Sequence, residues 1–244
     1  MPAEEHESAE QLNERLQSNY DELAEMAGSL AHEIKNPLSV IRMNMDLLGE
    51  DFAEPETQRE RRAVSKVDLV RSQCERLENL LNDFLRFVRL CKLDLHAGSL
   101  DEQLERVLDL FDLQARESEI EVIRYLDRDL PSILLEPQML QAALVNLVKN
   151  SLEAMPDGGR LEVRTRQTLF GVALDLIDNG CGMDQNTAIH MFDPFYSTKN
   201  GGSGLGLPMT QRIIDAHGGR IDVDSVVGHG TKFTIEFPTP KRIS

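Results

Sequence analysis

Apolar residues recur at helical spacing along the first part of the chain. Between residues 12 and 48 the gaps are three or four residues, with one gap of seven, and this spacing predicts one long helix of about ten turns. The pattern breaks over 49–58, where Pro55 lies, and resumes over 64–88 with the alternation typical of heptads. Two long helices with a short connection predict an antiparallel hairpin. Because a hairpin with one apolar stripe per helix can bury little alone, we expect two copies to pair as a homodimeric four-helix bundle.

The pattern changes after a short link at 95–98. Ser99 and Glu102 have the spacing of a capping box and predict a helix to about Glu117. Strands and helices then follow without strict alternation, which predicts an α+β layer with helices on one face of a sheet. The expected strands are 120–126, 161–168, 172–177, 220–226 and 231–237, and the expected helices are 138–154 and 205–216. The expected organisation is a helical lead-in over 1–20, a helical domain over 21–94 and an α+β domain over 99–240.

The chain is strongly acidic, with 26 Lys and Arg against 42 Asp and Glu and a formal net charge of −16. This balance argues against a general affinity for nucleic acid or anionic membrane, so an anionic ligand must meet local, organised donors. No run approaches the roughly 18 apolar residues that span a bilayer, and the three cysteines lack metal-ligand spacing. We therefore expect a cytoplasmic segment with free thiols and no membrane contact.

His32 lies in the middle of the first predicted helix, within Leu-Ala-His-Glu-Ile-Lys-Asn-Pro-Leu at 30–38. At about 100° per residue its side chain points away from the apolar stripe. Asn36 shares its face, and Pro37 predicts a bend. A neutral imidazole is a good nucleophile, and Glu33 can accept a hydrogen bond from one ring nitrogen while leaving the other free. An exposed histidine beside a glutamate also fits a plain solvated surface, although a proline in mid-helix weakens that interpretation.

The segment His-Glu-Ile-Lys-Asn-Pro-Leu resembles the H-box of two-component sensor histidine kinases. By this resemblance His32 accepts a phosphoryl group from ATP, while Glu33 orients it and takes up its proton. The resemblance also assigns Asn36 to a phosphatase activity, in which its amide positions water against the aspartyl phosphate of a response regulator. The alternative for Asn36 is that it only satisfies backbone groups loosened by Pro37.

Residues 144–154, Leu-Val-Asn-Leu-Val-Lys-Asn-Ser-Leu-Glu-Ala, resemble the N-box of the same family. An amide oxygen can complete a Mg²⁺ shell otherwise made of phosphates and water. The resemblance gives Asn150 this role and sets Asn146 to help hold the phosphates. Lys149 is a weaker candidate, better explained as a solvated lysine. Either asparagine alone could simply decorate an exposed helix.

Asp-Asn-Gly-Cys-Gly at 178–182 resembles the first glycine box. A carboxylate there can accept a hydrogen bond from the exocyclic amine of adenine, so Asp178 is the expected adenine reader. Gly180 and Gly182 would let the backbone approach the base and reach positive φ. An Asp-Asn-Gly turn is also a common loop, so this motif is weak alone.

Phe-Asp-Pro-Phe-Tyr-Ser-Thr-Lys at 192–199 resembles the F-box, and Gly-Gly-Ser-Gly-Leu-Gly-Leu at 201–207 resembles the second glycine box. Glycine-rich backbone at a helix N-terminus suits phosphate, and the loop between the boxes could close over ATP with Lys199 on the γ-phosphate. The lid sequence looks like that of the nitrogen-regulation branch. The further nucleotide contacts that the resemblance places here are Phe195, Thr198, Gly202, Gly204, Leu205 and Gly206.

Five motifs in family order over about 20–238 imply a dimeric helical bundle followed by an α/β sandwich of the Bergerat, or GHKL, ATP-binding type. The implied activity is autophosphorylation with ATP and Mg²⁺, followed by transfer to the aspartate of a separate response-regulator receiver domain. One alternative on the same fold is an ATP-hydrolysing clamp. Such relatives carry a general-base glutamate one turn before the metal-binding asparagine, where this chain has Asn146, whose amide cannot serve as a base. A second alternative, a non-catalytic dimerisation scaffold, leaves the nucleotide motifs unexplained.

Overall fold

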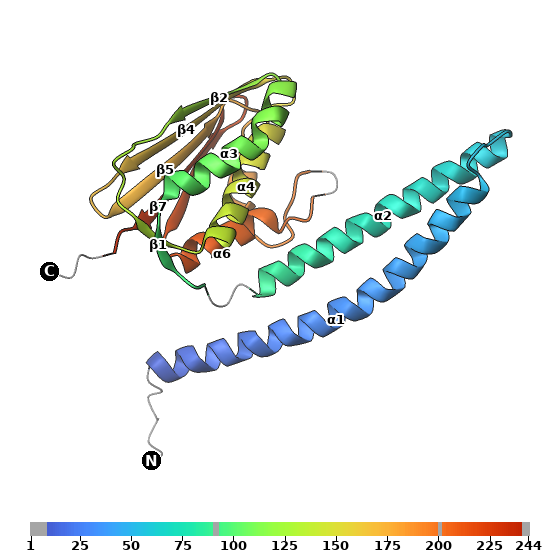
Figure 1. Ribbon diagram of the computed structural model, residues 1–244, viewed down its shortest axis with the longest axis horizontal. Helices are drawn as coiled ribbons and strands as arrows, with labels where there is room; N and C mark the ends of the chain where they lie inside the picture. Colours follow the sequence, from blue (N-terminus) through green and yellow to red (C-terminus); the bar gives the residue numbers. More distant parts are fainter. Residues whose placement is uncertain (1–8, 90–92, 200–201, 241–244) are drawn as a thin grey trace, which may run out of the picture. The chain divides into compact units, whose positions relative to one another are not determined.

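The computed structural model describes residues 9–89, 93–199 and 202–240. The chain divides into two compact units, Met1–Cys91 and Lys92–Ser244, which Figure 1 shows as a helical hairpin and a sheet covered by helices. Within the described ranges, no helix is both long enough and apolar enough to cross a membrane. The predicted lead-in over 1–20 lies partly outside the described residues, which begin inside it.

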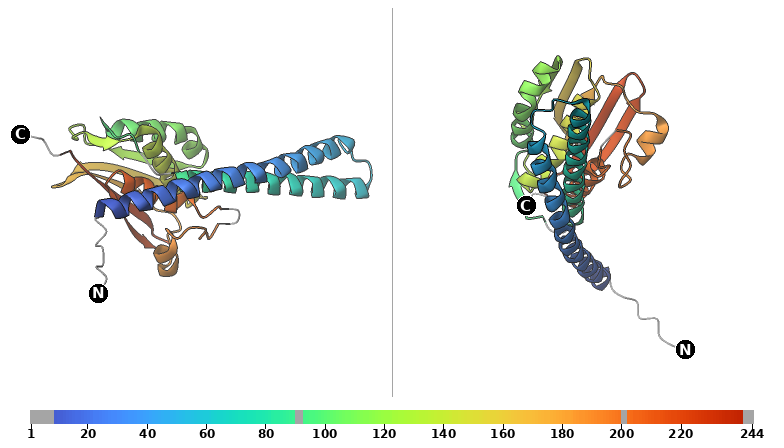
Figure 2. Two further views of the ribbon diagram at one scale, coloured as in Figure 1. Left: turned by 90° about the horizontal axis from the view of Figure 1, so that it is seen from below. Right: turned by 90° about the vertical axis from the view of Figure 1, so that its right-hand side faces the viewer.

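The first unit consists of α1 (Ala9–Asp51) and α2 (Gln58–Arg89), which run side by side along the hairpin (Figure 2). Helix α1 continues through Pro37. Helix α2 begins with a reciprocal capping box that the sequence analysis did not single out. Thr57 Oγ1 accepts the N–H of Glu60 at 3.2 Å, while the Glu60 carboxylate accepts the N–H of Thr57 at 3.0 Å. The Glu60 carboxylate also accepts the N–H of Glu56 at 2.8 Å, and the backbone hydrogen bonds from Thr57 and Glu56 lower the pKa of Glu60.

The hairpin buries only part of its predicted stripe. Small and medium side chains fill the seam where the two helices meet, and an ion pair from Arg42 to Glu78 at 3.1 Å bridges them. Other stripe members, among them Leu30 and Ile34, are exposed in the single hairpin, although the spacing placed them with the core. The buried seam residues are Ala27, Ala31, Leu38, Val67 and Cys74. The exposed stripe residues are Leu30, Ile34, Ile41, Leu48, Val70 and Leu77.

The second unit is built on a five-stranded sheet of order β2-β4-β5-β7-β6. Only β2 and β4 are parallel, and the other neighbours are antiparallel. Because successive side chains of a strand face opposite sides, β4 and β7 alternate buried with more exposed positions, whereas β5 at the centre is almost entirely buried. The five strands are β2 (Ile120–Tyr125), β4 (Gly159–Gln167), β5 (Gly171–Asp178), β6 (Arg220–Val226) and β7 (Gly230–Pro238).

Three helices cover one face of this sheet: α3 (Leu100–Glu117), α4 (Pro137–Glu153) and α6 (Gly206–Ala216) (Figure 1). Ser99 caps α3 by accepting the N–H of Glu102 at 3.3 Å, as its position predicted. Leucines of α3 and α4 form one cluster with the inner side chains of β4, β5 and β7. The core therefore sits between the sheet and the helices, and α4 lies in its middle.

His217, at the end of α6, ties this helix to the start of α4. Its Nδ1 bonds the Ile213 carbonyl at 2.7 Å, and its Nε2 accepts the N–H of Glu136 at 3.0 Å. Both ring nitrogens of this buried side chain are thus used, which requires the neutral form with the proton on Nδ1. Glu136 in turn caps α4 through its side chain.

Three short elements were not predicted from the sequence. Strand β1 (His96–Gly98) pairs with β3 (Ile133–Leu135) as a separate two-stranded sheet, so the predicted link at 95–98 is partly strand. Helix α5 (Gln185–His190) was also missed. Each is too short to establish a period, which explains why pattern reading overlooked them.

Candidate active site

The predicted phosphoacceptor residues lie together on one exposed stretch of α1. His32, Glu33 and Asn36 are all exposed, and the helical spacing predicted this for His32 and Asn36. Ala27 and Ala31 on the same helix are buried, and their small side chains let α2 approach closely. His32, which follows Ala31, is therefore left on the outer surface of the hairpin. The other predicted site residues belong to the second unit.

Asn146 connects α4 to the start of α6. Its Nδ2 donates to Thr210 Oγ1 at 2.9 Å, and the Thr210 hydroxyl donates to the Gly206 carbonyl at 3.0 Å. A side chain at Gly206 would bring its Cβ to 2.4 Å from Asn146 Oδ1, so a larger residue there would displace the Asn146 side chain from its present position. The N-box and the second glycine box are therefore one packed structure.

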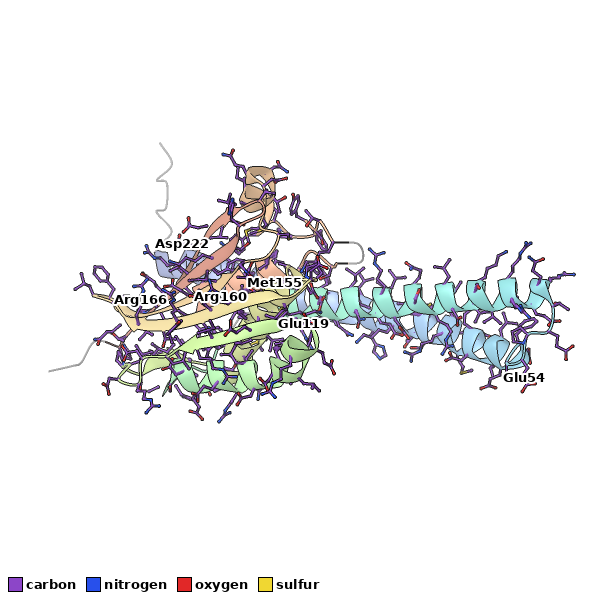
Figure 3. The ribbon with its side chains drawn as sticks, turned by 90° about the horizontal axis from the view of Figure 1, so that it is seen from above. Glu54, Glu119, Met155, Arg160, Arg166 and Asp222 are labelled. Carbon is purple, nitrogen blue, oxygen red and sulfur yellow. The ribbon has the colours of Figure 1, made fainter. Side chains whose placement is uncertain are left out.

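Asp178 ends the central strand β5 and is only 4% exposed. Its Oδ1 accepts the N–H groups of Gly180 at 3.0 Å and Thr231 at 3.1 Å. Burial raises the pKa of the Asp178 carboxyl, and these two backbone hydrogen bonds oppose the rise. The turn after it is held by Asn179, whose Oδ1 accepts the N–H of Arg160 at 2.7 Å. Figure 3 labels Arg160 at this end of β4.

The two glycines of this turn are required by contacts within the protein. A Cβ at Gly180 would lie 2.5 Å from the Ala154 carbonyl oxygen. At Gly182, where φ is +63°, it would lie 2.1 Å from the Val226 carbonyl oxygen. The positive φ predicted for this turn is therefore found at Gly182. Close approach of a ligand to either residue stays a prediction.

The F-box and the second glycine box are joined at their bases. Phe195 N–H donates to the Gly204 carbonyl at 2.9 Å, and both residues have positive φ. Phe195 and Thr198 are exposed, and the N–H of Gly202 donates to the Lys199 carbonyl at 3.2 Å. Gly201 lies outside the described residues.

The side chain of Leu205 is buried, although Leu205 was expected among the nucleotide contacts. Its side chain is 1% exposed and so belongs to the core. Its backbone N–H donates to Ser203 Oγ at 3.3 Å. Any contact of Leu205 with a ligand would therefore have to involve its backbone.

Lys199 reaches back to α4. Its Nζ donates to Asn150 Oδ1 at 2.7 Å and forms an ion pair with the Glu153 carboxylate. Lys149 Nζ lies 3.8 Å from the other Glu153 oxygen, so it is a surface cation, consistent with its weaker standing as a candidate. The structure thus brings together Lys199 and Asn150, which lie 49 residues apart.

Three residues of this site went unnoticed in the sequence: Thr210, Thr231 and Glu153. Thr231 acts through its backbone N–H, which no residue type reveals. Thr210 lies one helical turn after Gly206, a spacing that could have shown its bond to that carbonyl. Glu153 lies three residues after Asn150, so helical spacing could have placed it beside Asn150.

Two family models match the chain. The first, described as a His Kinase A (phospho-acceptor) domain, matches residues 22–90. The second, described as a histidine kinase-, DNA gyrase B- and HSP90-like ATPase, matches residues 136–241. Together they cover more than half of the chain, one in each unit.

Curated relatives and solved structures agree with these matches. The signal transduction histidine-protein kinase AtoS of Escherichia coli K12 is 32% identical over 88% of this chain and 35% of its own length. The sensory histidine kinase/phosphatase NtrB of Klebsiella oxytoca is 31% identical over 89% of this chain and 62% of its own length. The chain therefore spans only part of each relative.

Among solved structures, full-length ShkA in complex with AMPPNP matches with a TM-score of 0.70 and 28% identity, over 88% of this chain and 46% of that chain. The catalytic domain of the histidine kinase ThkA matches with a TM-score of 0.56 and 28% identity, over 60% of this chain and 97% of that chain. The hairpin matches the phosphoacceptor model, the sheet unit matches the ATPase model, and the curated relatives match along most of the chain. The chain therefore belongs to the sensor histidine kinases of two-component systems.

Proposed function

We propose that this chain is an ATP-dependent protein histidine kinase module that phosphorylates its own His32. The observation that carries the proposal is the convergence of four motifs in the second unit. Around α4, Asn146 contacts the start of α6 and Asn150 contacts Lys199 of the lid. The turn that follows Asp178 packs against the end of the same helix, where Gly180 lies against Ala154. The exposed His32 of the hairpin supplies the nucleophile.

Asp178 would recognise adenine. Both of its backbone hydrogen bonds go to Oδ1, so we assign Oδ2 to the exocyclic amine of the base. A buried carboxylate is a strong acceptor because little water competes with the ligand. The first turn of α6 would hold phosphate through its unpaired N–H groups, with Gly202, Gly204 and Gly206 keeping the backbone accessible.

The residues present fit a magnesium ion carried by the triphosphate. Asn150 Oδ1 already holds a cation, the ammonium of Lys199, and amide oxygen is a ligand that Mg²⁺ accepts. When bound, the ion would neutralise charge that develops on the transferring phosphoryl group. Asn150 would hold it, and Asn146 would hold the phosphates from the preceding turn of the helix.

Transfer requires His32 to meet the γ-phosphate in line. One imidazole nitrogen forms the new bond to phosphorus, while the bond from phosphorus to the bridging oxygen breaks and ADP leaves. The proton on the other nitrogen passes to Glu33, whose carboxylate also fixes the ring orientation before attack. Positioning and charge neutralisation supply most of the catalysis.

The proposal extends to partners. The phosphoryl group of His32 would pass to an aspartate of a response-regulator receiver domain, and Asn36 would position water for the reverse, dephosphorylating activity. The similarity to NtrB, which is named a kinase/phosphatase, supports the second activity. The exposed part of the hairpin stripe supports a homodimer, because a second copy could bury it as a four-helix bundle.

Transfer profiling tests this function directly. The chain is incubated with γ-labelled ATP and Mg²⁺, freed of nucleotide and mixed with a panel of receiver domains. We expect label on the chain and rapid passage to a preferred receiver. Release of inorganic phosphate with no protein-bound label would favour the hydrolysing clamp, and failure to bind ATP would favour the scaffold.

A further inference from the structure

Lys199 and Glu153 form a contact that the proposed roles leave unexplained. The Lys199 ammonium touches Asn150 Oδ1 at 2.7 Å and pairs with the Glu153 carboxylate. Asn150 and Glu153 are three residues apart on α4 and so lie on one face of the helix. Both side chains of the ion pair remain partly accessible, with 47% of Lys199 and 37% of Glu153 exposed.

An amide oxygen beside a carboxylate oxygen is a donor set suited to a hard cation. Here an ammonium group takes that place. The atom it touches, Asn150 Oδ1, is the one proposed to bind Mg²⁺. An ammonium and a divalent ion at one oxygen would repel each other strongly, so the two cations must occupy Asn150 in turn.

The charge of Glu153 leads to the same conclusion. A carboxylate near a triphosphate is unfavourable unless a cation lies between them. Lys149 contributes some positive charge to Glu153, but at 3.8 Å it is the more distant lysine. Lys199 satisfies the carboxylate when no nucleotide is bound, and a metal ion would satisfy it once Lys199 has turned toward phosphate.

We propose that Glu153 is a second cation-holding residue of the nucleotide site. With Asn150 it holds the Lys199 ammonium in the nucleotide-free protein, and the pair exchanges this ammonium for Mg²⁺ as nucleotide binds. The exchange frees Lys199 to neutralise the phosphates. This inference rests on the proposed ATP site and adds a positioning residue whose role is to couple metal binding to release of the lid lysine.

The first test needs no nucleotide. The rate at which an amine-acylating reagent modifies Lys199 is measured by mass spectrometry, with exposed Lys66 as an internal reference. In Glu153→Gln the Lys199 rate should rise about threefold, the size expected for an ion pair exposed to this extent. Glu121→Gln, which removes an equal charge from the exposed position 121 of β2, should leave the rate unchanged. An unchanged rate in Glu153→Gln would overturn the inference.

The second test compares ATP affinity with Mg²⁺ and with EDTA. In Glu153→Gln, affinity in EDTA should rise about threefold because a negative charge is lost and Lys199 is released. Affinity with Mg²⁺ should fall or stay level, so the advantage conferred by the metal shrinks. An equal advantage in Glu153→Gln and the parent chain would also overturn the inference. Those outcomes leave the kinase proposal standing, whereas a parent chain that binds no ATP with Mg²⁺ would refute both.

Discussion

The two units of the chain bury their apolar side chains to very different degrees. In the sheet unit, Leu147, Leu161 and Leu174 lie in a continuous core with no exposed area. In the hairpin, Leu30, Ile41 and Leu77 stay exposed although they fall on the predicted stripe. The sheet unit thus completes a core of its own, whereas the exposed stripe of the hairpin is what the proposed pairing of two copies would bury.

The largest expected effect is on the stability of the sheet unit and comes from a substitution in its core. Leu147→Ala removes a fully buried side chain from the helix that carries Asn146 and Asn150. We expect a loss of about 2–5 kcal/mol in the free energy of unfolding of that unit. Hydrogen exchange measured by mass spectrometry would show faster exchange in the sheet unit and unchanged exchange in the hairpin. Equal acceleration in both units would show that they do not fold independently.

The second-largest effect is expected on the proposed dimer contact of the hairpin. Leu77→Lys places a charge on the exposed stripe, and each copy contributes one such residue to a symmetric pair. A buried leucine contributes about 1.5–3 kcal/mol and two are lost from the pair, so the dimer dissociation constant should rise at least about a hundredfold. Sedimentation equilibrium measures it.

Met43→Lys is the matched control, because Met43 is exposed but lies off the stripe. It should leave the dimer constant within a fewfold of the parent value. Equal weakening by both substitutions would mean that the stripe does not mark the contact between copies.

The sequence predicted the helices and central strands well, because long periodic segments reveal which face is apolar. It could not divide the stripe into a seam buried within one hairpin and a surface left exposed. That division depends on the side of α1 against which α2 packs. The spacing places Leu30 and Leu38 on the same face, yet Leu38 is buried and Leu30 is exposed.

The candidate site shows a similar limit. The motifs singled out Asn150 and Lys199 as separate candidates, but their contact arises only because the lid folds onto α4. For two glycines the structure adds a reason that the sequence did not supply. Gly180 and Gly206 were assigned to ligand approach, and the structure adds an internal reason for each, the Ala154 carbonyl and the Asn146 side chain.

A smaller effect should come from Asp178→Asn. The amide keeps an oxygen for the two backbone N–H groups but loses the charge-assisted bond to adenine, so ATP affinity should fall about tenfold. Calorimetric titration measures this loss. The substitution should not lower the melting temperature, because it removes a buried charge. A large drop in melting temperature would indicate a structural role instead.

The pH dependence of stability and of ATP affinity follows from the Asp178 carboxyl. Burial raises its folded-state pKa above the unfolded value, so the stability that proton binding contributes is present at low pH and is lost as pH rises through the raised pKa. ATP affinity should change in the opposite sense, falling as pH is lowered through that value. Asp178→Asn should flatten both dependences, and a parent chain whose affinity is flat over this range would contradict the assignment.

The smallest expected effect on self-labelling is that of Asn36→Ala. The residue shares the exposed face of His32, yet attack on ATP does not require it. Autophosphorylation should stay close to the parent rate, while dephosphorylation of the cognate phosphorylated regulator collapses. Two rate assays on one preparation decide the point. Equal loss of both would indicate that Asn36 supports the helix around Pro37, and an unchanged phosphatase rate would remove it from the site.

The central claim is that the chain moves phosphate from ATP to His32, and one labelling experiment addresses it most directly. The parent chain and His32→Gln are incubated with γ-labelled ATP and Mg²⁺, then the protein-bound label is challenged with acid and alkali, and nucleotide affinity is measured in parallel. We predict acid-labile, alkali-stable label on the parent chain, none on His32→Gln, and closely similar ATP affinity for the two. Full labelling of His32→Gln would contradict it.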